Sequence, residues 1–383
     1  MARLKILFIL ILAIPGVMAF PQVKVRLYSN YSPESAVFSV THGKYEINLF
    51  KGDSLFLSEG EAVIIAMYKG KLAVKPRNSG GFICDSAVFT GKTGNDSFSL
   101  RINGNSHARQ LYSGDFECFP DLGTLVMINT CNIEKYIAGV VWAEGGSGWN
   151  KEYFKTQAII TRTYLYKYFD KHLGDKYNVC DNTHCQVFNG LSSDALINRA
   201  ALETQGLVLL DQDSSLIISA FHSNCGGETS LPEDVWLTGQ SYLKKVVDPY
   251  CLSSGNARWE KRIPLSVWLE FIKKAGYNGK TDDPSVFNFI QEYRLTDYQA
   301  GSFTIPLGTI RNGMHLRSTF FSVFAAGDFI ILKGRGFGHG VGLCQEGAME
   351  MAKRGFNYHQ IIDFYYNNVL ISDIKNCKMK KYN

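Results

Sequence analysis

Short runs of alternating apolar and polar residues dominate the first third of the chain. Runs of this kind predict strands, and turn residues separate one from the next. Because strands at this spacing form a β-sandwich or a barrel-like layer, we interpret residues 20–128 as a β-rich scaffold or recognition domain. The predicted strands are residues 23–28, 37–40, 62–66, 71–74, 98–102 and 124–128.

The pattern changes near residue 132, where apolar residues begin to recur at three- and four-residue spacing. This predicts helices over residues 133–143 and 151–170, with Asn150 as the N-cap of the second helix and Glu152 in its first turn. We find no internal repeat and no low-complexity linker after this point. We therefore predict one mixed α/β domain over residues 129–383 and an α+β fold class for the whole chain. The further predicted elements are helices at 193–204 and 265–275, a strand at 206–210 and two short helices in the last 50 residues.

The first nineteen residues have the order of a secretory signal peptide. Arg3 and Lys5 precede an apolar stretch at 6–14, and small residues follow at 17–19. The alternative is an uncleaved membrane anchor, for which the apolar stretch is short. We expect export across the inner membrane, to the periplasm or the cell wall.

Composition excludes several classes of protein. The 383 residues are 45% hydrophobic and 20% charged, which is typical of a folded globular chain rather than a disordered or polytopic membrane protein. Without residues 1–19 the chain has 38 basic and 35 acidic residues, too weak a balance to indicate nucleic-acid binding. No phosphate-binding loop is present, so we expect no nucleotide.

All nine cysteines lie beyond the predicted signal peptide. An exported protein can oxidise them, and the odd number leaves at least one thiol free, bound to metal or paired with another chain. We expect a disulfide between Cys225 and Cys251.

Glu144 is the strongest candidate for acid–base chemistry. On the predicted helix it shares a face with Ile137, Val140 and Val141, and Gly145 ends the helix directly after it. Desolvation and the negative end of the helix dipole would both raise its pKa. A general acid for glycosidic cleavage needs such a carboxyl group. The alternative, a glutamate at a frayed helix end that points to water, is the commoner arrangement.

The following predicted helix has four polar side chains in two pairs, each pair two turns apart. They are Lys155 with Arg162 and Gln157 with Tyr164. These groups could line a sugar cleft, although lysine and arginine on a helix more often form a solvated face.

Cys180, His184 and Cys185 lie within six residues. They could bind zinc with a fourth ligand from elsewhere or from water. A local disulfide between the two cysteines is the alternative.

Glycine occupies every second position from 334 to 342. In an extended segment these glycines would face one side and let a ligand or another chain approach the backbone closely. His339, at the centre, could be a ligand, a hydrogen-bonding site residue or a buried core histidine.

Together these segments resemble the stage II sporulation protein D family. The resemblance covers roughly residues 98–377, with five motifs in the family's order. They are EKYIAGVVWAE at 134–144, KTQAIITRTY at 155–164, CDNTHCQ at 180–186, SNCGG at 223–227 and GFGHGVGLCQ at 336–345.

The resemblance implies that residues 129–383 are the catalytic domain of a lytic transglycosylase, with a glycan-binding cleft. The expected substrate is peptidoglycan glycan strands already stripped of stem peptides. Glu144 matches the family's catalytic glutamate, and Cys180, His184 and Cys185 match the loop from which members bind a structural zinc. Gly145, Gly146 and Glu346 depart from the usual pattern. A role in sporulation is not implied. The expected substrate-binding residues are Lys155, Gln157, Arg162, Tyr164, Gln186, Ser223, Gly338, His339, Gly340 and Gln345.

Two other functions fit the same residues. One is a non-catalytic peptidoglycan-binding protein that enhances a partner cell-wall amidase. The other is a zinc amidase, which needs a metal with an open coordination position. The cysteine-rich ligand set favours a structural metal, so we rank the zinc amidase last.

Overall fold

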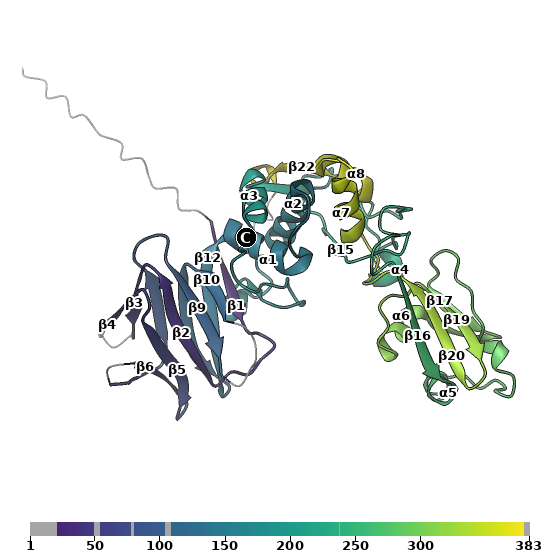
Figure 1. The fold of residues 1–383 in the computed structure, drawn as a ribbon, viewed down its shortest axis with the longest axis horizontal. Helices are drawn as coiled ribbons and strands as arrows, with labels where there is room; N and C mark the ends of the chain where they lie inside the picture. The colour runs from purple at the N-terminus through teal and green to yellow at the C-terminus, as the bar shows by residue number, and fades with distance from the viewer. Residues whose placement is uncertain (1–20, 50–53, 78–79, 104–108, 237, 379–383) are drawn as a thin grey trace, which may run out of the picture.

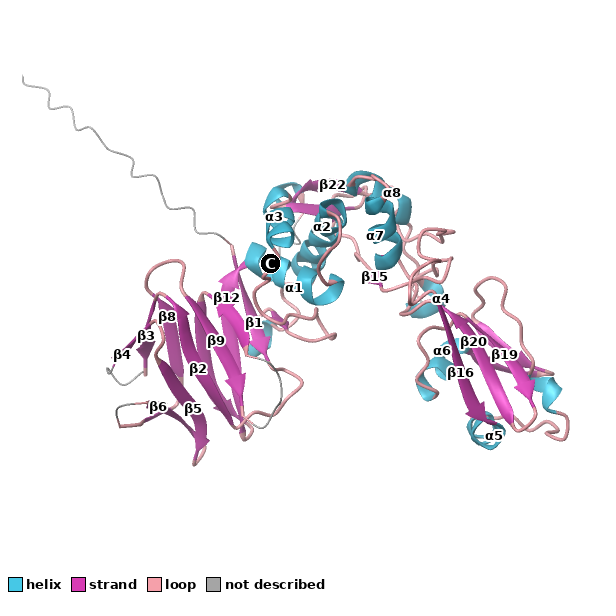
Figure 2. Ribbon diagram, in the orientation of Figure 1, coloured by secondary structure: helices cyan, strands magenta, loops and turns pink. Residues whose placement is uncertain are grey.

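The computed structural model describes residues 21–49, 54–77, 80–103, 109–236 and 238–378. The predicted signal peptide at residues 1–19 lies outside these ranges. A β-rich part, a helical part and a smaller β-containing part follow one another along the molecule (Figures 1 and 2). The α+β fold class is confirmed, and no helix within the described ranges is both long and apolar enough to span a bilayer.

Two sheets pack together in the N-terminal part. The first has the strand order β13-β1-β12-β11-β8-β3-β4 and the second β10-β9-β2-β5-β6-β7. Phe38 and Phe98 of the second sheet contact Phe89 and Phe116 of the first, with ring centroids 4.5 to 5.5 Å apart. The strands are β1 (Gln22–Leu27), β2 (Ser35–His42), β3 (Lys44–Asn48), β4 (Ser54–Ser58), β5 (Ala62–Tyr68), β6 (Lys71–Pro76), β7 (Phe82–Cys84), β8 (Ala87–Gly91), β9 (Ser97–Ile102), β10 (Gln110–Ser113), β11 (Asp115–Asp121), β12 (Thr124–Asn132) and β13 (Val179–Cys180).

All six strands predicted in this region are present, and alternation is clearest in β2, where every second residue is buried. The strands that the sequence missed are mostly short or polar at their ends. β11 contains Pro120 and is bounded by Asp115 and Asp121, all of which weaken a strand pattern.

The helical part begins without a break after β12. Asn132 caps α1 (Ile133–Gly145). As predicted, Asn150 caps α2 (Lys151–Lys167). Around α2 pack α3 (Ala195–Glu203), α7 (Gln345–Lys353), α8 (Tyr358–Tyr365) and a small sheet of β14 (Leu207–Leu210) with β22 (Leu370–Asp373). The buried apolar side chains of these elements form one continuous core with those of the two large sheets. The 3₁₀ helices η1 (Leu173–Asp175) and η3 (Ile374–Asn376) and the short helix α4 (Glu233–Trp236) lie in the connections.

The third part has a core of its own around the fully buried Trp268. The predicted helix at 265–275 is α5 (Leu265–Lys274). The other elements are β16 (Arg258–Pro264), η2 (Pro284–Phe287), β17 (Asp297–Ala300), β18 (Phe303–Pro306), α6 (Leu307–Gly313), β19 (Phe321–Ala326) and β20 (Phe329–Arg335).

The glycine-rich segment after β20 is not extended, so that expectation was wrong. Gly336, Gly338, Gly340 and Gly342 have φ values between +71° and +114°, a region that residues with a Cβ rarely adopt. The close backbone approach does occur, but against residues 220–226 of this chain. A Cβ at Gly342 would lie 2.1 Å from the carbonyl oxygen of Ala220. This contact accompanies the parallel pairing of β15 (Phe221–His222) with β21 (Leu343–Cys344).

Candidate active site

Glu144 lies in the last turn of α1 and is half-buried. Ile137, Val140 and Val141, on the same helix face, are fully buried. Burial raises the pKa of the Glu144 carboxyl above its ordinary value, and a hydrogen bond from the backbone N–H of Val187 to Oε1, 3.1 Å long, opposes that rise. The carboxyl group therefore keeps its proton to a higher pH than an exposed glutamate would.

Two cavities meet at Glu144. One, of about 570 Å³, lies between the end of α1 and the start of α7. The other, of about 690 Å³, is bordered by α2, the loop around Gln186 and the segment around Phe221. Both volumes are in the range of small-molecule sites. Glu144 borders both cavities, so a chain-like ligand could pass it with one residue on either side.

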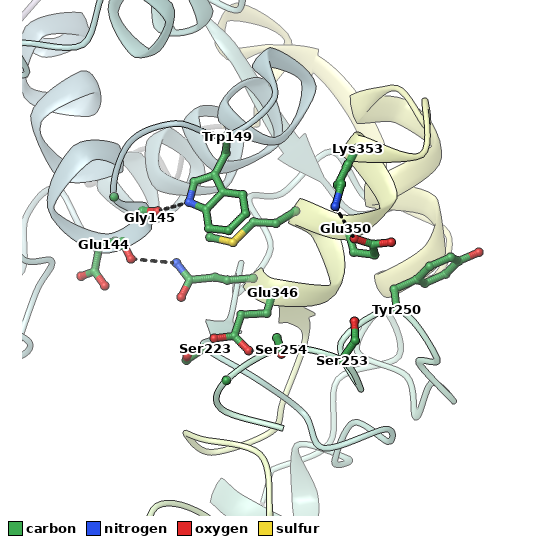
Figure 3. Close-up of a pocket in the computed structure, with 14 residues that line it drawn as sticks. Glu144, Gly145, Trp149, Ser223, Tyr250, Ser253, Ser254, Glu346, Glu350 and Lys353 are labelled. Atoms are coloured by element: carbon green, nitrogen blue, oxygen red, sulfur yellow. Dashed lines mark hydrogen bonds and ion pairs between the residues drawn. The ribbon is translucent and has the colours of Figure 1, made fainter. Parts of the chain in front are cut away.

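Most side chains that line the first cavity are polar, and Figure 3 shows how its walls meet. Gln345 Nε2 lies 3.5 Å from the backbone carbonyl oxygen of Glu144. The Glu144 carboxyl points away from Trp149 and Glu346 (Figure 3). The indole N–H of Trp149 donates to the carbonyl of Gly145 at 3.0 Å. Ser223 lies on the facing wall, where its carbonyl accepts a hydrogen bond from the Glu346 N–H at 3.0 Å.

Glu346 brings a second carboxylate to this cavity. Its two oxygens accept hydrogen bonds from Asn224 Nδ2 and Asn256 Nδ2, both at 2.5 Å, and from the hydroxyl of Ser254. Because these neutral donors occupy both oxygens, the carboxylate is fixed in the wall rather than free to approach a sugar carbon.

The second cavity is mostly apolar and aromatic. Tyr164, Gln186 and His339, all predicted site residues, line it beside Trp236. The rings of His339 and Trp236 lie 5.3 Å apart, and His339 Nδ1 accepts the Val341 N–H at 3.0 Å. Burial lowers the pKa of His339 to about 4, so its imidazole is neutral at pH 7.

Three of the predicted substrate-binding residues, all on α2, line neither cavity. Arg162 is fully buried, where it forms a two-pronged ion pair with Glu134 and donates to the carbonyls of Leu207 and Ala201, so it cannot touch a ligand. Gln157 is also fully buried on α2. Lys155 forms ion pairs with Glu152 and Glu203 at 3.1 and 3.0 Å.

Gly338 and Gly340 act through their backbone. A Cβ at Gly338 would lie 2.8 Å from His222 Cβ, and the carbonyl of Gly340 accepts the Ser230 N–H at 2.7 Å. These two glycines hold the turn that carries His339 toward the second cavity.

The structure adds a fourth candidate ligand, His172, to the predicted metal loop. The ligand atoms of His172, Cys180, His184 and Cys185 all lie within 4.8 Å of one another. Three sulfur–nitrogen pairs are 3.4, 3.6 and 3.8 Å apart. A tetrahedral zinc ion with bonds of about 2.3 Å to sulfur and 2.0–2.1 Å to nitrogen separates such atoms by about 3.6 Å. These residues fit a closed Cys₂His₂ zinc site, and both cysteines are free thiols rather than the alternative disulfide.

A family model described as stage II sporulation protein, SpoIID, matches residues 122–210. This range contains α1 with Glu144. It also contains the whole segment from His172 to Val187, here called the Cys/His loop, which carries the four candidate metal ligands. Residues 122–210 belong to the SpoIID family. The family resemblance drawn from the five motifs is thereby confirmed.

Among curated proteins, similar chains come from two bacterial groups. An uncharacterized protein of Brachyspira hyodysenteriae is 28% identical over 348 residues, 86% of this chain and 88% of that protein. The stage II sporulation protein D of Bacillus subtilis is 28% identical over 261 residues, 63% of this chain and 74% of that protein. The amidase enhancer of Bacillus subtilis is 26% identical over 283 residues, 60% of this chain but 39% of that protein.

Sequence reasoning missed several residues of this SpoIID family site. His172 lies eight positions before Cys180, outside common zinc-ligand spacing, and only a search for every histidine near the cysteine pair would have found it. Trp149 lies in a loop and Trp236 ends the short helix α4, and the place of each beside Glu144 depends on tertiary structure.

The disulfide expected between Cys225 and Cys251 is not formed. Both are free thiols, with their sulfurs 3.3 Å apart. Cys344 and Asp248 lie beside them.

Proposed function

We propose that this protein is an exported peptidoglycan lytic transglycosylase, with Glu144 as its general acid and base. The observation that carries the proposal is the position of Glu144, half-buried between two cavities, with a pKa raised by burial. The SpoIID family model and the amidase enhancer among the relatives support a role related to the cell wall.

The substrate would be a glycan strand lying across Glu144. Sugars on one side would occupy the polar cavity near Gln345, and those on the other side the aromatic cavity near Trp236. An aromatic wall offers a flat apolar surface to a sugar ring, and neutral His339 at its edge offers a hydrogen-bonding group.

One carboxyl group is sufficient for this reaction. Protonated Glu144 gives its proton to the glycosidic oxygen that leaves from N-acetylmuramic acid, and the bond from that oxygen to C1 breaks. The C6 hydroxyl of the same sugar forms a new bond to C1 and returns its proton to Glu144. The products are a 1,6-anhydro end and a free hydroxyl on N-acetylglucosamine, and no water is consumed.

An ordinary glycosidase needs a second carboxylate as nucleophile or base. Glu346 is the candidate for that role in the first cavity, but Asn224, Asn256 and Ser254 occupy its oxygens. This arrangement favours the transglycosylase over the two-carboxylate hydrolase.

The Cys/His loop would support the reaction indirectly. A zinc ion held by His172, Cys180, His184 and Cys185 would supply a structural cross-link, since four protein ligands leave no open position for substrate. Val187, two residues beyond Cys185, donates to the Glu144 carboxyl. The loop therefore fixes one oxygen of the proposed acid.

A second candidate is a non-catalytic enhancer of a cell-wall amidase. The similarity to the Bacillus subtilis amidase enhancer favours it. It would keep both cavities for glycan binding but would not need a protonated Glu144.

Product analysis separates these functions. Residues 20–383 are incubated with glycan strands that carry stem peptides and with strands that an amidase has stripped. Mass spectrometry showing new 1,6-anhydro ends on stripped strands supports the transglycosylase, and new reducing ends would indicate a hydrolase. Strands that are retained but never cut, with faster release of stem peptides by an added amidase, would indicate the enhancer.

A further inference from the structure

Four ligand-type side chains from three separate segments converge beneath the first cavity. Cys225 follows β15, Asp248 and Cys251 lie in the loop that follows Val246, and Cys344 is the N-cap of α7. All four are buried, and one ligand atom from each lies within 4.8 Å of every other. Cys225 Sγ is 3.3 Å from both Cys251 Sγ and Asp248 Oδ2.

These separations suit one tetrahedral metal ion. Zinc bonds of about 2.3 Å to sulfur place two ligand sulfurs about 3.8 Å apart, so the group needs shifts of only a few tenths of an ångström. A [4Fe–4S] cluster needs wider spacing, since each of its cysteine sulfurs binds a different iron. Three thiolates and one carboxylate are donors that zinc accepts.

Hydrogen bonds already orient the donors. Tyr365 Oη donates to Asp248 Oδ2 at 2.9 Å, and the Tyr250 N–H donates to Oδ1 at 2.8 Å. The backbone N–H groups of Cys225 and Gly347 point to Cys344 Sγ at 3.3 and 3.4 Å. Outer hydrogen bonds of this kind fix ligand orientation in metal sites.

Charge also indicates a bound cation. Asp248 is fully buried and forms no ion pair with any basic side chain in the described ranges. A buried carboxylate without a positive partner is costly, and a metal ion removes that cost. Nearby, buried Arg294 donates to the carbonyl of Cys225 at 2.7 Å, where its charge offsets the excess negative charge of three thiolates.

We propose that Cys225, Asp248, Cys251 and Cys344 form a second, structural zinc site. A disulfide between Cys225 and Cys251 would account for two of the four groups and leave Asp248 and Cys344 buried without a partner of opposite charge. One zinc ion accounts for all four and ties together the segments that carry Ser223, Ser254 and Gln345 into the wall of the first cavity.

Metal content tests the proposal on the whole exported chain, residues 20–383, without substrate. Protein purified with zinc present is washed free of loose metal and measured by elemental mass spectrometry. The Cys180→Ser/Cys185→Ser variant, which disables the first site, is expected to retain one zinc per chain. The Cys225→Ser/Cys344→Ser variant is expected to lose one zinc relative to the unaltered chain, and Cys377→Ser, outside both clusters, is the matched control that loses none.

The unaltered chain gives a second measurement if a variant does not fold. Zinc X-ray absorption is expected to show more sulfur than nitrogen and oxygen ligands, because three of four donors at the second site are thiolates. Equal numbers of sulfur and nitrogen ligands, or a peptide joining Cys225 to Cys251 by a disulfide in unreduced protein, would overturn the proposal. So would a folded Cys180→Ser/Cys185→Ser variant that contains no zinc. Since none of these readouts involves glycan cleavage, failure of the proposed activity would not be mistaken for failure of this site.

Discussion

The backbone N–H of Val187 donates a hydrogen bond, 3.1 Å long, to Oε1 of Glu144. Val187 belongs to the Cys/His loop, whereas Glu144 ends α1, so this contact joins the candidate metal site to the candidate acid. It occupies one carboxyl oxygen and leaves the other for proton exchange. The geometry of the acid thus depends on how firmly the loop is held.

The stability of the fold should depend on pH through Glu144. Burial raises the pKa of this carboxyl in the folded state, so the folded chain holds a proton that the unfolded chain has released. Stability contributed by this proton is full below the unfolded pKa of about 4.3 and is lost as pH rises through the folded pKa. Urea unfolding measures the free energy of unfolding of the unaltered chain and of Glu144→Gln across this window. As pH rises, the unaltered chain should lose stability relative to Glu144→Gln. A constant difference would contradict a raised pKa.

Removing His172 should weaken zinc binding at the Cys/His loop. Loss of an outer-sphere partner typically costs about 10–100-fold in metal affinity, and loss of a direct ligand should cost at least as much. Competition with a chromogenic chelator measures the affinity of His172→Ala. His42→Ala, an exposed histidine paired with Glu59 in the N-terminal part, is the control. Equal zinc affinity in the two variants would exclude His172 as a ligand.

Arg162 should matter for stability rather than for substrate affinity. Arg162→Met leaves Glu134 buried without its partner, which typically costs about 3–5 kcal/mol. Lys155→Met removes a partly exposed ion pair and should cost about 0–1 kcal/mol. Urea unfolding measures both costs, and KM should remain unchanged in each folded variant. A stable Arg162→Met protein with a raised KM would instead place Arg162 in contact with the substrate.

Glu346→Gln should preserve the chemistry. If Glu346 serves only in the cavity wall, activity should fall by less than about tenfold, against about 10² to 10⁴ for loss of a general acid. Product release from stripped strands measures the rate, and Glu350→Gln, in the same cavity, is the control. A loss as large as that for Glu144→Gln would show that two carboxylates are needed.

Local signals made the elements around the site predictable. Asn150 and Glu152 mark the start of α2 in the sequence, and apolar spacing with Gly145 marks the face and end of α1. These signals depend on neighbouring residues, so they needed no tertiary information. The placement of Glu144 on a buried face followed from the same spacing.

Other features depend on long-range contacts that spacing does not encode. The sequence predicts that Arg162 faces solvent or a ligand, because it does not show the pairing of Arg162 with Glu134 on a neighbouring helix. His172 and Asp248 reach their cysteine clusters only through the fold. The glycines at 336–342 adopt positive φ because the chain turns against residues 220–226, and alternation alone could not distinguish this from a strand.

The most direct test of the central claim is the rate at which Glu144→Gln releases 1,6-anhydro ends from peptide-stripped strands. Glutamine keeps the size of the side chain and an oxygen for the Val187 N–H, but it cannot donate a proton as an acid. We predict a folded protein that still retains the strands and whose rate is about 10² to 10⁴ times lower than that of the unaltered chain. Unchanged release of anhydro ends by a folded Glu144→Gln protein would contradict the account.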